Sequence, residues 1–262
     1  MNGRSRADLD FLLGCGEAAR ALGLSYFTHL DQPVGILNYI RIAGDVVAQV
    51  PSGHLLDWGC GYGQMTYLLR RRGLEVTAFD FGSPGDTVLP DLPLCVGLEV
   101  VRTDHPTKLP FDDGTFAAVL SCGVLEHVDE SSEPGAEVKS LLELHRVLRP
   151  GGHLLIYQLP QRHAWQEALA RRLRRAYFHP RLYTAAEITA MLRDAGFFVA
   201  RLKRANMLPK NLTGLPGTVR RLYSRFSGVV LALDAALCKV PGLRAVAGSL
   251  EVTAVKRGED RG

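Results

Sequence analysis

Three glycines at alternate positions, Gly59, Gly61 and Gly63, constrain the fold of this chain more than any other feature. They follow a short apolar run that ends in Asp57, and they precede apolar residues at helical spacing. The segment therefore predicts a strand, a glycine loop and a helix. Glycine adopts positive φ angles without steric penalty and lets a ligand approach the main chain. We expect the loop either to bind a ligand or to form a tight turn without one.

The spacing of the glycines separates the candidate ligands. The dinucleotide fingerprint G-x-G-x-x-G would need its third glycine where Gln64 stands, and the phosphate loop G-x-x-x-x-G-K-[ST] does not occur. The pattern Asp-x-Gly-x-Gly-x-Gly, from Asp57 to Gly63, instead resembles motif I of the class I S-adenosylmethionine-dependent methyltransferases. In that family the loop surrounds the methionine and ribose parts of the cofactor. The resemblance implies that Asp57 and the three glycines bind S-adenosylmethionine.

The composition fits one α/β domain better than two. The chain has 262 residues, of which 47% are hydrophobic, and its formal net charge is +4. This mild basicity permits acidic partners without requiring nucleic acid. Five scattered cysteines without ligand spacing indicate reduced thiols, and no signal peptide is recognisable. No apolar run approaches the ~20 residues of a membrane-spanning helix, so we expect a cytoplasmic protein.

A second acid follows at the end of the next predicted strand. Residues 74–80 are mainly apolar and end in Asp80, near the distance after Gly63 at which dinucleotide-binding folds place an acid on ribose hydroxyls. A carboxylate accepts both hydrogen bonds of a cis-diol. Asp80 is therefore a candidate ribose ligand, and the alternative is a solvated strand end.

The segment from Asp104 to Leu120 resembles the third and fourth motifs of the same family. The resemblance implies that Asp104 binds the adenine amino group, with His105 beside the ring. It also implies that Phe81 and Ser121, at the ends of two strands, contact the cofactor.

The sequence Leu-Glu-His-Val, residues 125–128, follows the fourth predicted strand and resembles a motif of small-molecule methyltransferases, especially quinone-pathway O-methyltransferases. Some of those relatives use a further Glu, three residues before the Glu-His pair, as a third metal ligand. Gly123 occupies that position here, so only two ligands remain and the sequence assigns no metal site, although two ligands still permit a bound ion. Histidine suits proton transfer at neutral pH. His127 is therefore either a general base for an acceptor hydroxyl or a hydrogen-bonded cap on the following helix.

Two segments are additions to the minimal fold, at about 161–183 and 216–241. The first has an apolar stripe and five arginines, which either attract an anionic acceptor or lie on a solvated helix face. They are Arg171, Arg172, Arg174, Arg175 and Arg181. In the second, residues 218–240 predict a basic amphipathic helix, either a lid packed on the domain or a helix resting on a membrane surface. Asp234 and Gly228 interrupt its apolar face, which favours the lid.

Together these patterns predict a doubly wound, Rossmann-like α/β sheet of seven strands, six parallel and the last antiparallel. We expect a helical cap over residues 1–52 and a methyltransferase domain over residues 53–262 that contains both insertions. The resemblance implies methyl transfer from S-adenosylmethionine to an oxygen or nitrogen of a small molecule, a sugar or a lipid-linked acceptor. The Asn/Asp-Pro-Pro-Tyr motif of base-methylating relatives is missing after the fourth strand. Nucleic-acid methylation and a non-catalytic cofactor-binding role are the alternatives.

Overall fold

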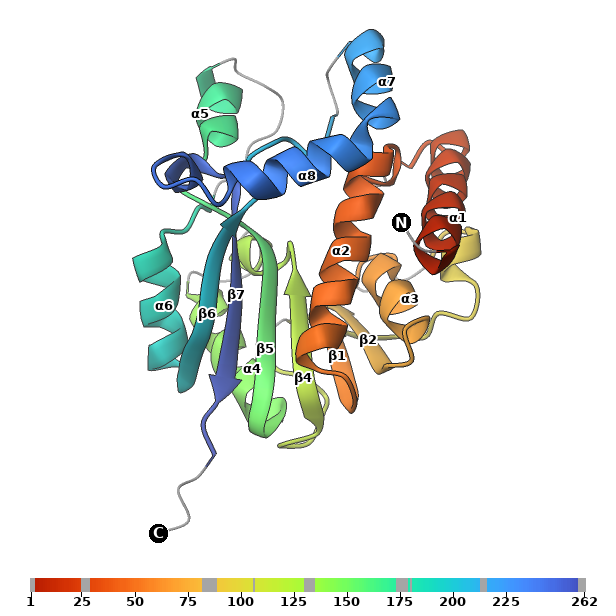
Figure 1. Ribbon diagram of the computed structural model, residues 1–262. Helices are drawn as coiled ribbons and strands as arrows, with labels where there is room; N and C mark the ends of the chain where they lie inside the picture. Colours follow the sequence, from red (N-terminus) through yellow and green to blue (C-terminus); the bar gives the residue numbers. More distant parts are fainter. Residues whose placement is uncertain are drawn as a thin grey trace.

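In the computed structural model, the seven predicted strands form one sheet (Figure 1). The structure describes residues 3–24, 29–81, 89–105, 107–129, 135–172, 179, 181–212 and 216–258. The strands are β1 His54–Trp58, β2 Glu75–Phe81, β3 Val100–Thr103, β4 Phe116–Cys122, β5 Leu148–Pro160, β6 Phe197–Ala205 and β7 Ser249–Lys256. Their order is β3-β2-β1-β4-β5-β7-β6, and β7 is antiparallel to both of its neighbours. The predicted Rossmann-like fold is confirmed.

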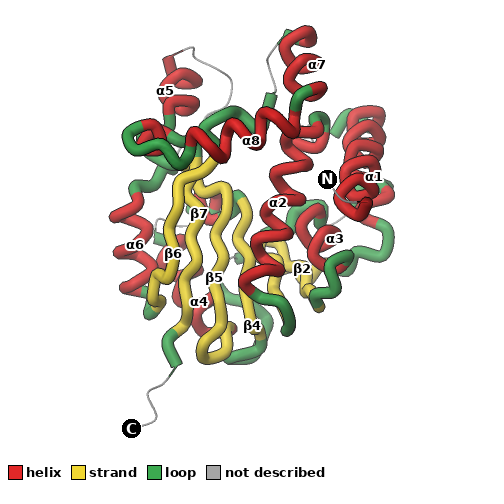
Figure 2. Tube along the Cα trace, in the orientation of Figure 1, coloured by secondary structure: helices red, strands yellow, loops and turns green. Residues whose placement is uncertain are grey.

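Helices cover both faces of the sheet (Figures 1 and 2). The helices α1 Gly3–Ala21, α2 Pro33–Gln49 and α3 Gln64–Arg70 lie on one face, and α4 Ala136–Val147 and α6 Ala185–Asp194 lie on the other. Successive residues of a strand point to opposite faces. Accordingly, Leu120 of β4 packs in the core under α2 and α3, while Val119 packs in the core under α4 and α6. Burial on both faces explains why β4 is apolar from Phe116 to Leu120.

Two buried carboxylates attach the N-terminal helices to the rest of the fold. Asp8 of α1 is fully buried and pairs with Arg71 after α3, with 2.6 Å between the charged groups. Glu251 of β7 pairs with Arg41 of α2 at 2.5 Å. Residues of α1 and α2 also share one hydrophobic core with β1, β4 and β5. The N-terminal helices therefore form a layer against the sheet.

Three helices stand above the C-terminal ends of the parallel strands, where ligands bind in open α/β sheets (Figure 1). The first insertion contains α5 Trp165–Arg172, and the second contains α7 Gly217–Arg225 and α8 Ser227–Leu237. The prediction of one helix over 218–240 was wrong, because Phe226 leaves helical geometry at φ −109° and ψ 22°. Among the described residues, no helix combines the length and apolarity that crossing a bilayer requires.

Candidate functional site

The glycine loop between β1 and α3 is fixed to the tip of β2. The amides of Gly59 and Cys60 both donate to the carbonyl oxygen of Phe79 at 2.9 Å, and the amide of Gly63 donates to Cys60 at 2.9 Å. The φ angles of Gly59, Gly61 and Gly63 are 75°, 54° and 85°. These left-handed values strain residues other than glycine, which explains the spacing in the sequence.

The three glycines differ in what surrounds them. A Cβ on Gly59 would lie 2.4 Å from the side chain of Val124, and a Cβ on Gly63 would lie 2.4 Å from that of Leu98. No described atom outside the immediate chain neighbours would lie within 4 Å of a Cβ on Gly61. Gly59 and Gly63 therefore permit close packing, whereas Gly61 opens the main chain to a ligand. We call the open position at Gly61 the glycine cradle.

Asp57, at the end of β1, lies beneath the loop. Its side chain is 2% exposed and accepts a 2.6 Å hydrogen bond from the hydroxyl of Thr66 in α3. Burial raises the pKa of the Asp57 carboxyl to about 6, although the bonds from Thr66 oppose this shift. Asp57 therefore connects the strand before the glycine loop to the helix after it.

Asp80, at the tip of β2, lies beside the glycine cradle. The amide of Phe81 donates to its carboxylate at 2.9 Å, and the amide of Gly61 also hydrogen-bonds it. Arg102 of β3 approaches to 3.9 Å. Burial raises the pKa of Asp80, and these donors and the Arg102 charge lower it. The structure thus brings the predicted cofactor residues Asp80 and Gly61 into contact.

The remaining predicted cofactor residues lie at the same edge of the sheet in different environments. Ser121, at the end of β4, pairs in register with Trp58 of β1, and its buried hydroxyl has no hydrogen-bond partner among the described residues. Asp104 and His105 follow β3 and are exposed. Thr103 donates to the carbonyl of His105 at 2.8 Å, which fixes the backbone there.

Glu126 and His127 lie on η4 Leu125–His127, a single 3₁₀ turn after β4. A carboxylate oxygen of Glu126 is 4.0 Å from Nε2 of His127, and the side chains are 3% and 37% exposed. The amide of Glu137, in the first turn of α4, donates to Asp129 at 2.9 Å. Asp129 thus serves the start of α4.

Three polar residues that sequence reasoning left out of the site also lie near Glu126. Tyr39 of α2 is buried, and the side chains of Gln64 and Gln158 hydrogen-bond its hydroxyl. Burial raises the pKa of Tyr39, so it stays protonated at neutral pH. Gln158 has a φ of 60°, and its amide donates to the sulfur of Cys122 at 3.3 Å. In the sequence, a polar glutamine inside the mainly apolar strand β5 could have marked Gln158 as a candidate site residue.

The arginines of the first insertion serve different purposes. Arg181 pairs with Glu137 at 2.8 Å and with Glu187 at 2.9 Å, so its charge is neutralised within the chain. Arg171 donates to the carbonyl oxygen of His179 at 2.8 Å. Arg172 is exposed at the end of α5. The other two predicted arginines, Arg174 and Arg175, and the end of the apolar stripe lie outside the described residues.

Comparisons with known proteins agree with this geometry. Residues 56–156 match the family described as "Methyltransferase domain". The chain is 31% identical over 177 residues to a ubiquinone biosynthesis O-methyltransferase of Xanthomonas axonopodis pv. citri, covering 63% of this chain and 72% of that protein. The chain belongs to the class I S-adenosylmethionine-dependent methyltransferases. The cofactor of this methyltransferase is therefore S-adenosylmethionine.

Other relatives match the methyltransferase over a smaller share of their length. A fatty-acid O-methyltransferase of Mycolicibacterium smegmatis is 37% identical, over 56% of this chain and 57% of the relative. A probable tRNA methyltransferase 9B of Mus musculus is 31% identical, over 50% of this chain and 26% of the relative. The chain thus spans about a quarter of the length of the tRNA methyltransferase 9B and little more than half of the length of the fatty-acid O-methyltransferase.

The fold also recurs in solved structures. A structure from Thermotoga maritima, described as an S-adenosylmethionine-dependent methyltransferase and possible histamine N-methyltransferase, superposes with a TM-score of 0.56. The alignment covers 94% of this chain and 98% of that one, at 14% sequence identity. At this identity the likeness shows the shared architecture and leaves the acceptor open.

Proposed function

We propose that the glycine cradle and Asp80 hold S-adenosylmethionine, and that this methyltransferase moves the methyl group to an oxygen or nitrogen of a small or lipid-linked acceptor. The observation that carries the proposal is the open main chain at Gly61 with the Asp80 carboxylate hydrogen-bonded beside it. A side chain at Gly61 would occupy this space, so the sequence is fitted to a ligand there.

The chain offers polar partners for the ribose and the adenine of the cofactor. Asp80 can accept from the two ribose hydroxyls, and the buried Ser121 hydroxyl has hydrogen-bonding capacity to spare. Asp104 and His105 are exposed at the tip of β3, where they can reach the adenine group. Asp57 has a different task, because its carboxylate is buried against Thr66 and sets the loop in place.

Bound S-adenosylmethionine supplies a methyl group on a positively charged sulfur. Attack by an oxygen or nitrogen cancels or reduces charge at the reacting centre, so the protein contributes mainly positioning and exclusion of water. We assign the activation of an acceptor hydroxyl to Glu126 and His127, which stand at the end of β4. Tyr39 stays protonated and is held by two glutamines, so it can donate a hydrogen bond to the acceptor.

The test is metabolite profiling with an isotopically labelled methyl donor. The wild-type protein is expected to transfer label to a small or lipid-soluble product, and His127→Ala to reduce turnover by about 10²-fold or more. Calorimetry with S-adenosylhomocysteine should give the same affinity for both proteins. His163→Ala is the matched control, because this exposed histidine lies in the first insertion and has no assigned role in the site. Label appearing in RNA would favour the nucleic-acid alternative, and absence of nucleoside binding would refute the proposal.

We further propose that α7, α8 and the turn after them rest on an anionic lipid surface. Eight of the 15 large apolar side chains exposed among the described residues belong to this segment. They are Val219, Leu222, Phe226, Val229, Leu233, Val240, Leu243 and Val246. We call these eight residues the apolar crown. So large a share of exposed apolar surface in one short segment indicates an interaction site.

The buried face of α8 explains why the apolar crown points outward. Asp234 is buried and accepts a 2.6 Å hydrogen bond from the amide of Leu208, and it pairs with Lys210 at 2.9 Å. Val229 and Leu233, on the other side of the same helix, are 65% and 51% exposed. Asp234 therefore anchors the buried side of α8 and does not interrupt the exposed apolar face. The reason that Asp234 gave for preferring a lid over a membrane-surface helix no longer holds.

Basic residues accompany the apolar crown. Arg221, Arg225, Lys239 and Arg244 are exposed in the same segment. An amphipathic surface of this composition binds bilayers through apolar burial plus attraction to anionic headgroups. The surface lies above the C-terminal ends of the strands, beside the proposed acceptor site (Figure 1). A lipid-linked acceptor could therefore pass from the bilayer to the site.

Vesicle co-sedimentation tests this surface. We expect binding to vesicles of equal parts phosphatidylcholine and phosphatidylglycerol, and weaker binding to phosphatidylcholine alone. Replacing Leu222 and Phe226 by serine should weaken binding about tenfold or more, since each loses part of the ~1.5–3 kcal/mol of a buried apolar side chain. Leu142→Ser on α4 is the matched control, because Leu142 is also half exposed but lies on another face. Equal sedimentation of all three proteins would overturn the membrane proposal.

A further inference from the structure

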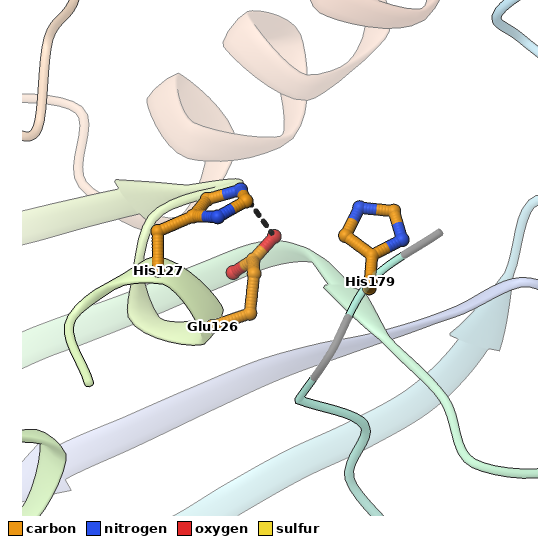
Figure 3. A group of neighbouring side chains, drawn as sticks. All are labelled: Glu126, His127 and His179. Atoms are coloured by element: carbon orange, nitrogen blue, oxygen red, sulfur yellow. Dashed lines mark ion pairs between the residues drawn. The ribbon is translucent and has the colours of Figure 1, made fainter. Parts of the chain in front are cut away.

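We infer that Glu126, His127 and His179 form a binding site for a divalent transition-metal ion (Figure 3). One carboxylate oxygen of Glu126 and one ring nitrogen of each histidine all lie within 4.8 Å of one another. The three side chains come from two distant segments, since His179 belongs to the first insertion and the other two residues to η4. Figure 3 shows the three side chains beside one another, with the carboxylate of Glu126 between the two imidazole rings.

The distances are close to those of a coordinated ion. Ligand atoms that lie about 2.0–2.2 Å from one metal are separated by at most about 4.4 Å. The carboxylate of Glu126 and Nε2 of His127 are already 4.0 Å apart. All three ligand atoms lie within 4.8 Å of one another, so side-chain rotations that shift them by about an ångström would bring them to the spacing of a coordinated ion.

An outer carboxylate orients His179 for coordination. Nδ1 of His179 is 2.6 Å from a carboxylate oxygen of Glu167 in α5, and the backbone amide of His179 donates to the other oxygen at 3.3 Å. Donation from Nδ1 to Glu167 would make Nε2 the ring nitrogen that binds the metal. A carboxylate behind a ligating histidine is the usual support of such ligands.

The donor set selects the class of ion. Two imidazoles and one carboxylate suit Zn²⁺, Co²⁺, Mn²⁺ or Fe²⁺, whereas Mg²⁺ and Ca²⁺ prefer oxygen ligands. His127 and His179 are 37% and 30% exposed, so one side of the site faces solvent. Three protein ligands with an open position are typical of a catalytic zinc site.

The role of the ion rests on the proposed function. A hydroxyl of the acceptor would occupy the open position, where the ion lowers its pKa and its proton passes to solvent water. The oxygen lone pair then forms the new bond to the methyl carbon, and the broken S–C bond returns its electrons to sulfur. His127 thus acts as a ligand, and the metal replaces a general base.

Metal titration of the folded protein after chelator treatment tests the site. Calorimetry with ZnCl₂ should give one equivalent per chain, His179→Ala should abolish this binding, and Glu167→Gln should weaken it by about 10–100-fold. A Co²⁺ spectrum without a thiolate charge-transfer band would exclude the cysteines as ligands. The control is His163→Ala, which should bind like the wild type.

The outcomes separate the metal site from the methyltransferase function. S-adenosylhomocysteine should bind the wild type, His179→Ala and Glu167→Gln equally, because the glycine cradle is built from other residues. Equal zinc stoichiometry in the wild type and His179→Ala, or no zinc binding at all, would overturn the metal site while nucleoside binding persisted. Loss of nucleoside binding in the wild type would instead refute the proposed function.

Discussion

The Thr66 hydroxyl donates a 2.6 Å hydrogen bond to the Asp57 carboxylate, which joins the strand before the glycine loop to the helix after it. Both side chains are buried, at 1% and 2% exposure. The bond fixes the two ends of the loop, while the amides of Gly59 and Cys60 fix its middle to β2. The loop is therefore held in shape by the chain itself.

Replacing Asp57 by asparagine should change how stability depends on pH. Burial raises the Asp57 pKa from 3.8 to about 6, so the folded state holds a proton that the unfolded state releases between these values. The free energy of unfolding of the wild type therefore falls as pH rises from about 4 to about 6. The fall is about 3 kcal/mol from this group, at about 1.4 kcal/mol per pKa unit.

The asparagine side chain would still accept from Thr66 and carries no charge to bury. Asp57→Asn should therefore equal the wild type near pH 4 and exceed it by about 2–3 kcal/mol near neutral pH. Urea unfolding of the ligand-free proteins across this range measures the difference. Thr66→Val is the control for the hydrogen bond, and it should lower stability at every pH. Parallel curves for the wild type and Asp57→Asn would show that Asp57 does not titrate there.

Alanine at Gly61 should separate cofactor binding from stability. The φ of 54° costs a residue with a Cβ about 1–2 kcal/mol, but the added methyl meets no described atom within 4 Å. It occupies the glycine cradle, so calorimetry should show the affinity for S-adenosylhomocysteine reduced by more than tenfold. Gly59→Ala should destabilise further, by about 1–3 kcal/mol, because its methyl would lie 2.4 Å from Val124. Unchanged affinity in folded Gly61→Ala would place the cofactor elsewhere.

The sequence predicted the sheet and the loop because both depend on local patterns. Glycines at positive φ and the continuous apolar run of β4 each have one economical structural solution. Asp80 and Gly61 were placed together because strand tips of a parallel sheet share one edge. These features require no knowledge of which distant segments meet.

The features that the sequence did not predict depend on distant contacts. His179 reaches η4 only because residues after it pack on α4, and Tyr39 reaches Gln158 only because α2 crosses the sheet. Periodicity also could not tell which side of α8 is buried. Asp234 is buried through its pairing with Lys210, whereas hydropathy alone would bury Val229. Tertiary pairing thus overrode the amphipathic pattern.

Asp234→Ala should release α8 from the domain. The substitution removes the acceptor of the Leu208 amide and leaves the ammonium group of Lys210, which is 9% exposed, without its ion pair. Breaking a buried pair on one side costs about 3–5 kcal/mol. Limited proteolysis should therefore cleave within residues 216–240 faster than in the wild type. The double variant with Lys210→Met should recover resistance, because it removes the unpaired charge; equal cleavage of all three proteins would contradict the anchor.

Tyr183→Phe should loosen the segment that follows His179. The Tyr183 hydroxyl donates to the Glu137 carboxylate of α4, and the carbonyl oxygen of Leu125 in η4 lies 3.3 Å away. Phenylalanine keeps the ring beneath the Arg181 guanidinium, whose carbon lies 4.4 Å from the ring centre, so only the hydroxyl is lost. Thermal and urea unfolding should show a loss of about 1–2 kcal/mol, the usual effect of one buried hydrogen bond.

Glu137→Ala is the more severe companion to Tyr183→Phe. It leaves both the Tyr183 hydroxyl and the Arg181 guanidinium without the carboxylate that now accepts from them. The Tyr183 hydroxyl then keeps only the Leu125 carbonyl and Arg181 keeps only Glu187, so the loss should exceed that of Tyr183→Phe and reach about 3 kcal/mol. If the carboxylate holds the insertion against η4, zinc affinity should fall in the same order, least in Tyr183→Phe and most in Glu137→Ala. Unfolding energies that fall in this order with zinc affinity unchanged would show that Tyr183 and Glu137 stabilise the core without positioning His179.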